Sequence, residues 1–200
     1  MRALVVIALA ACLIGCGREQ AAAPPPTSAP APASAQETGD AGLTAEGWGP
    51  LRIGMTMDEI TAALGPDANP DAVGGPDPES CNQFRPERAP EGMLLMVENG
   101  ELTRISLTHG SQIKTDRGFG LGDTAAAIKA AYGGGAVSNP HHYLGLPAEY
   151  IAAWTNVRPA PGEYVRDANA RGIVYETNLE GVVEDIHAGG PSIQYVEGCA

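Results

Sequence analysis

Aromatic and histidine side chains gather in one stretch of the chain and form its densest group of residues able to recognise a ligand. Tyr143, Tyr150 and Trp154 supply aromatic faces, and His141 and His142 directly precede the first of them. Aromatic faces next to amide and carboxylate groups suit the recognition of a sugar or of another protein. Tyr150 and Trp154 also fit a structural role as core residues on one side of a strand, since large aromatics are usually buried. We name all five as binding candidates and leave both interpretations open.

The histidines do not follow a metal-binding pattern. His141 and His142 are adjacent, and neighbours on an extended segment point to opposite sides, so both cannot easily hold one metal ion. His109 and His187 are distant in the sequence. We therefore expect no metal site and no cofactor.

Catalytic motifs are also missing from the sequence. It contains no G-x-S-x-G, H-E-x-x-H or paired C-x-x-C pattern. Residues 120–125 match G-x-G-x-x-A, but the polar segment 114–117 precedes them where a dinucleotide site needs a buried strand. The acidic pairs 58–59 and 184–185 lack the separation that glycoside hydrolysis requires. We expect no catalytic residue, and an enzyme is the least favoured class of function.

The charge balance argues against nucleic acid as a partner. The whole chain has a net charge of −12, and removing residues 1–15 takes away only Arg2 among the charged residues, which gives −13. An acidic surface repels phosphate backbones and favours a cationic protein partner. With only two Phe and two Trp, the core must consist mainly of aliphatic side chains.

Two segments, 51–65 and 119–133, share a pattern that predicts a short helix in each. Thr56 and Glu59 have the spacing of a capping box, and Thr124 can cap the second helix. A shift of 68 residues aligns the shared positions, which are Gly54 with Gly122, Thr56 with Thr124, Ile60 with Ile128, Ala63 with Ala131 and Gly65 with Gly133.

Strand patterns follow each predicted helix. Asn99-Gly100 between two apolar runs is a strong hairpin signal. We therefore predict an α+β fold of two tandem helix and antiparallel β-meander repeats, 47–116 and 117–200, packed as one domain. The sequence leaves open whether the repeats share one sheet. The predicted strands are 81–85, 93–98, 102–108, 150–157, 172–177, 182–187 and 192–197.

The Gly-Met-Thr helix start, the helix ending in Leu-Gly and the following meander resemble the repeat of the β-lactamase inhibitor protein and the SmpA/OmlA outer-membrane lipoproteins. Both families bind proteins, so the resemblance implies a non-catalytic binding role. Residues 139–143 and 195–199 are similar to uncharacterised proteobacterial lipoproteins, some of which are labelled lectins.

The N-terminus has the layout of a secretory signal, with Arg2 before a thirteen-residue apolar run. The run is shorter than the about 20 residues that span a bilayer. Leu13-Ile14-Gly15-Cys16 resembles the bacterial lipobox, which implies cleavage after residue 15 and lipidation of Cys16. Gly17, instead of aspartate, implies retention at the periplasmic face of the outer membrane. The alternative is an ordinary signal cut near residues 10–12, with a soluble product.

Residues 16–46 then form a Pro- and Ala-rich tether, which we expect to be disordered, and residues 47–200 form the folded domain. Cys81 and Cys199 are left as a pair in an oxidising compartment, which predicts a disulfide bond between them. A redox-active pair is the alternative, but neither cysteine lies in a C-x-x-C motif.

These observations together predict a lipid-anchored, non-catalytic binding or inhibitor module that presents a sheet surface to a periplasmic or envelope protein. The alternative is binding of an envelope carbohydrate, such as peptidoglycan glycan, through the region of Tyr143 and Trp154. The membrane is reached only through the lipid anchor.

Overall fold

The computed structural model describes residues 42–72 and 74–199. Cys16, the signal segment 1–15 and most of the tether lie outside these residues, so the predictions made for them stay predictions. We expected the folded domain to begin at residue 47, but Leu43 and Ala45 are buried in the core, and the Leu43 N–H donates to the Lys114 carbonyl. The fold therefore includes residues 42–46. No helix in the described part of the chain has the length and apolar character needed to cross a membrane.

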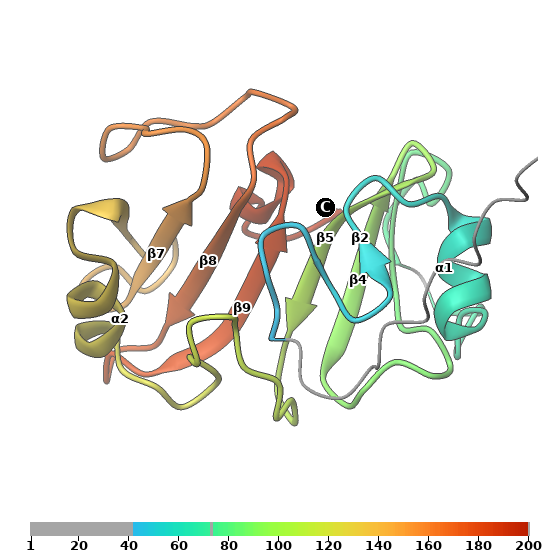
Figure 1. The fold of residues 1–200 in the computed structure, drawn as a ribbon, viewed down its shortest axis with the longest axis horizontal. Helices are drawn as coiled ribbons and strands as arrows, with labels where there is room; N and C mark the ends of the chain where they lie inside the picture. The colour runs from blue at the N-terminus through green and yellow to red at the C-terminus, as the bar shows by residue number, and fades with distance from the viewer. Residues whose placement is uncertain (1–41, 73, 200) are drawn as a thin grey trace, which may run out of the picture. The chain divides into compact units, whose positions relative to one another are not determined.

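Most of the regular structure is one antiparallel sheet of seven strands in the order β3-β4-β5-β9-β8-β7-β6 (Figure 1). A separate two-stranded sheet pairs β1 with β2. The elements in chain order are β1 (Gly47–Trp48), β2 (Leu51–Arg52), α1 (Met57–Leu64), β3 (Cys81–Phe84), β4 (Met93–Glu98), β5 (Glu101–Leu107), α2 (Ala125–Tyr132), the 3₁₀ turn η1 (Gly133–Gly135), β6 (Ala136–Pro140), β7 (Glu149–Trp154), β8 (Gly172–Thr177), β9 (Val183–Gly189) and the 3₁₀ turn η2 (Pro191–Gln194).

The predicted α+β fold of two tandem helix–meander repeats, 47–116 and 117–200, is wrong. The described part of the chain is mostly β, with two α-helices of eight residues each, and the strands of both halves from β3 to β9 join in one sheet. The reason lies at the junction of the two halves, where β5 pairs with β9 and Ser106 lies opposite His187. This pairing satisfies backbone groups that two separate meanders would leave on open edges.

Both helices are short because glycine ends them. Thr56 caps α1 and forms the predicted capping box with Glu59, and Gly65 follows the last turn with φ of 85°. Thr124 caps α2 in the same way, by accepting from the Ala127 N–H at 3.2 Å. These local predictions are confirmed.

The predicted strands agree best with the structure where apolar residues alternate on both sides of a clear turn. Asn99 and Gly100 form the predicted hairpin turn, with φ of 50° and 85°. Strand β6 was missed, and the predicted strand 192–197 is wrong. Pro191 there occupies the first turn of η2, a position that proline's fixed φ suits.

The sheet has one apolar face and one mixed face. The apolar face packs against α1 and α2, with Ile60 and Ile128 fully buried against strand residues such as Tyr175. The mixed face carries a smaller cluster around Trp154, which η2 and the loop 155–171 help to cover. Candidate binding residues have to be sought on this second face.

Cys81 on the edge strand β3 and Cys199 near the C-terminus are joined by a disulfide bond, with 5.5 Å between their Cα atoms. The predicted pairing is thus present. It fastens the segment after η2 to the far edge of the sheet.

Candidate functional site

The candidate residues lie on β7 and on the segment that leads into it. His141, His142 and Tyr143 follow β6, and the chain returns to the sheet at β7. Tyr150 and Trp154 occupy alternate positions of β7, so both face the mixed side, whereas Ile151 between them is fully buried on the helix side. The two parts of the candidate site meet at His141.

His141 is a buried hub with 8% of its surface exposed. Its Nδ1 accepts the backbone N–H groups of Tyr143 and Leu144, each at 3.2 Å. Because Nδ1 is an acceptor, the ring proton lies on Nε2, which is 2.8 Å from Oε1 of Glu176. His141 therefore fixes the start of the loop on one side and joins β8 on the other.

Glu176 also faces a second histidine. His187 Nε2 lies 3.6 Å from the Glu176 Oε2, and His187 Nδ1 lies 2.9 Å from the Ser106 hydroxyl. Burial acts to raise the pKa of Glu176, but hydrogen bonds and charge from the two histidines outweigh it and hold the pKa below its usual range. Burial lowers the pKa of His187, although the hydrogen bond and charge of Glu176 act to raise it.

A serine, a histidine and a carboxylate in contact have the composition of a hydrolytic triad, but this arrangement does not offer a nucleophile. Only 2% of Ser106 is exposed, so a substrate cannot reach its hydroxyl. Among the described residues no group of three or more His, Cys, Asp or Glu side chains is placed to hold a metal ion. Ser106, His187, Glu176 and His141 form instead a polar network that connects β5, β9 and β8 to the loop after β6.

Asp185 lies next to this network, directly across from Glu176 in the sheet. Desolvation by burial, with the charges of Glu176 and Glu184, raises its pKa to about 6. Two neighbouring carboxylates with pKa values pushed in opposite directions can share a functional site. Here the two carboxylate oxygens of Glu176 already face His141 and His187.

This network could not be read from the sequence, in which His187 is distant from His141. The one sequence signal for the network is that Glu176 and His187 are polar residues of two strands predicted to flank a turn. Their pairing with β5 depends on the junction that the repeat prediction did not contain.

The loop between His141 and Ala148 presents large apolar side chains to solvent. The exposed fractions are 61% for Tyr143, 47% for Leu144 and 71% for Leu146. The Tyr143 hydroxyl donates to the carboxylate of Glu197, so the C-terminal segment lies beside the loop. We call the surface made of Tyr143, Leu144 and Leu146 the apolar loop surface. In the neighbouring C-terminal segment, Tyr195 and Val196 are 37% and 42% exposed.

His142 belongs to the edge of this surface. It is exposed, and its ring meets that of Tyr143 edge-on with 4.9 Å between centroids. It has no contact with Glu176 or His187 among the interactions of the described residues. The structure thus separates the two adjacent histidines, one into the network and one onto the surface.

Tyr150 connects the loop to a groove in the mixed face. Its ring stacks on His141 with 4.8 Å between centroids, and its hydroxyl is 3.4 Å from His141 Nε2. The groove has a volume of about 340 Å³. Residues of β6, β7, β8, η2 and the loop after β7 line it, among them Asn139, Tyr150, Trp154, Val174, Tyr164 and Gln194.

Trp154 combines the two roles that the sequence left open. It is only 6% exposed and packs with Val174 and Ile193, as a core residue does, yet it also lines the groove. Tyr150 is half-buried and less enclosed. Most of the Trp154 side chain is therefore a core residue, and only the part that lines the groove could contact a ligand.

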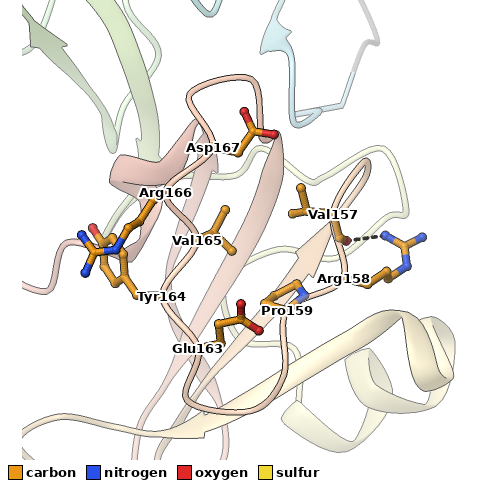
Figure 2. A pocket seen from close by; sticks show the side chains of 8 residues that line it. All are labelled: Val157, Arg158, Pro159, Glu163, Tyr164, Val165, Arg166 and Asp167. Atoms are coloured by element: carbon orange, nitrogen blue, oxygen red, sulfur yellow. Dashed lines mark hydrogen bonds between the residues drawn. The ribbon is translucent and has the colours of Figure 1, made fainter.

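A second hollow of about 610 Å³ lies along residues 157–167, and Figure 2 shows its lining. Arg158 and Arg166 lie on opposite sides of it and point away from each other. Arg158 Nη1 is held by the carbonyls of Trp154 and Val157 at 2.9 and 2.7 Å, and Arg166 lies over the Tyr164 ring at 5.4 Å. These guanidinium groups do not converge on a shared anion.

Comparison with known proteins gives no match, whether by family models, curated proteins or solved structures. The resemblance to lipoproteins and to the β-lactamase inhibitor repeat therefore stays a prediction.

Proposed function

We propose that this protein is a non-catalytic binding module of the bacterial envelope, attached through lipidated Cys16 to the periplasmic face of the outer membrane, and that it holds a protein partner on the apolar loop surface. The observation that supports this most is the exposure of Tyr143, Leu144 and Leu146 within one short loop. Contiguous large apolar side chains on a soluble domain are typical of interaction sites.

The loop is fixed before any partner arrives. His141 receives two N–H groups at its start, and the His141 N–H donates to the carbonyl of Ala148 at 2.9 Å across its base. Ala148 is fully buried, and Glu197 holds the Tyr143 hydroxyl. A surface held in this way loses little conformational entropy on binding, which favours affinity.

The charge of the protein limits the partner. The chain without residues 1–15 carries −13, and Glu197 lies beside the loop. A partner with an apolar centre and a basic rim matches this surface, because complementary charges speed association and exclude acidic competitors.

The proposed binding surface differs from the sheet face named in the sequence analysis. Much of the mixed face is covered, since Met96 and Arg104 are only 1% and 4% exposed. Arg104 Nη1 donates to the carbonyls of Ser192 and Tyr195, so the segment from η2 onward lies across the sheet. The loop beside that segment is exposed.

Charge substitutions on the loop test this proposal. Leu146→Asp should abolish the complex recovered after in-cell crosslinking, because it places a carboxylate at the centre of an apolar contact. Leu179→Asp is the matched control, since Leu179 is also exposed, at 49%, but lies in the turn between β8 and β9. Equal recovery from the two variants would contradict the proposal.

The anchor has its own test. Cys16→Ser should move the protein from the membrane to the soluble fraction, while the unmodified chain stays in the membrane. A Cys16→Ser chain that still sediments with the outer membrane would rule out lipidation as the attachment.

A further inference from the structure

We infer that the groove lined by Tyr150, Trp154 and Tyr164 is a second binding site, and that it takes an uncharged carbohydrate. This goes beyond the proposed function, because it depends on side chains inside the groove and not on the exposed loop. The groove's volume of about 340 Å³ is at the lower end of the range of roughly 300–1,000 Å³ for small-molecule sites, which suits one or two sugar rings.

Three aromatic side chains line the groove. Tyr150 and Trp154 come from its floor on β7, and Tyr164 comes from the loop that crosses beside them. Arg166 lies over the Tyr164 ring and helps to hold it, while that residue remains 43% exposed. Sugar rings have apolar C–H faces that pack on such aromatic surfaces, so three rings around a narrow space favour a ligand of this kind.

Polar groups with unused hydrogen-bonding capacity line the same space. The Asn139 side-chain oxygen accepts from Gly162, but its amide nitrogen forms no hydrogen bond with any described residue. Glu163 Oε2 accepts from Ala160, and its Oε1 has no partner within the described part of the chain. One donor and one acceptor are therefore available to hydroxyl or acetamido groups.

The charge of the lining excludes anionic ligands. It contains no Lys or Arg, and its one ionisable acid, Glu163, adds a negative charge to an already acidic protein. A nucleotide or a phosphorylated sugar would be repelled. Complementarity thus favours an uncharged ring with both donors and acceptors over any anion of similar size.

Fluorescence of Trp154 can report occupancy directly. The chain has two tryptophans, so Trp48→Phe leaves Trp154 as the only one. We would titrate the full chain carrying Cys16→Ser, which avoids detergent in the groove, with chitotriose and with cellotriose. A saturable change with either probe, weakened about tenfold by Tyr164→Ala and unchanged by Tyr143→Ala, is expected.

The inference is overturned if neither probe gives a saturable change, or if Tyr164→Ala leaves the change intact. If Trp48→Phe disturbs folding, saturation-transfer NMR on the chain with both tryptophans detects binding of the same probes and applies the same criteria. Loss of probe binding in Tyr143→Ala alone would place the sugar on the loop and also contradict the groove. Because Leu146 does not line the groove, failure of this experiment and failure of the proposed function are distinguishable.

Discussion

The disulfide between Cys81 and Cys199 should supply much of the stability of the fold, and the double variant Cys81→Ser/Cys199→Ser measures how much. The two residues are 118 positions apart, so the bond closes a loop that includes most of the folded chain. The chain-entropy relation for a loop of this length gives about 5 kcal/mol. This value is comparable with the whole free energy of unfolding of a small domain.

Urea unfolding followed by circular dichroism is the appropriate assay. With a urea slope of about 2 kcal/mol/M, typical of a domain this size, the loss corresponds to a midpoint lower by roughly 2.5 M. Ser80→Ala next to the bond is the control. Its midpoint should change little because Ser80 is exposed and its hydroxyl donates, within the described part of the chain, only to the Asp77 carbonyl at 3.1 Å. A midpoint that falls by less than about 0.5 M would refute the reasoning.

The remaining predictions concern titration, capping and backbone geometry. The pKa of Asp185 is about 6 in the folded state and 3.8 as a free side chain, so the folded state holds this proton more tightly and loses stability as pH rises through 6. Asp185→Asn should therefore be more stable than the parent at pH 8, by on the order of 2 kcal/mol, and the difference should be gone below pH 4. Thermal unfolding at the two pH values would show this. Thr56→Ala removes the capping box of α1 and should cost about 1 kcal/mol in urea unfolding, whereas Thr61→Ala on the exposed side of the same helix should cost far less. Gly189→Ala should prevent stable folding, since its φ is +146° and a Cβ there would lie 2.2 Å from the Thr103 carbonyl oxygen at the junction of β5 and β9; a soluble, cooperatively unfolding Gly189→Ala protein would contradict this. Gly172→Ala places a Cβ 2.8 Å from the Trp154 ring, so it should shift Trp154 fluorescence while the fold persists.

Local sequence signals predicted local structure well in this chain. Thr56 with Glu59 specified a helix start, and Asn99-Gly100 specified a hairpin, because in both cases the interacting groups lie within a few residues. The even pair of cysteines was also readable, since only two remain in the folded part. The fold class was not, because the pairing of β5 with β9 joins residues 79 to 85 positions apart and no local pattern specifies it.

The candidate site was predicted in part for the same reason. Tyr143, Tyr150 and Trp154 were selected by composition, and the structure gives them different environments. Tyr143 lies on an exposed loop, Tyr150 is half-buried in the groove floor, and Trp154 is largely buried there. Glu176 was not a candidate and His187 was set aside as distant, because each is an ordinary polar residue of a strand. Only the contacts of Glu176 with His141 and His187 make them a network. These contacts between side chains of different strands depend on the register of the sheet, which composition does not determine.

A photo-crosslinking residue at position 146 in living cells tests the central claim most directly. We predict a discrete adduct with one envelope protein, formed at position 146 and absent when the same residue replaces Leu179, which is also exposed but lies in a different turn. An absence of adducts at position 146, or the same adducts at both positions, would contradict the assignment of the apolar loop surface as the binding site.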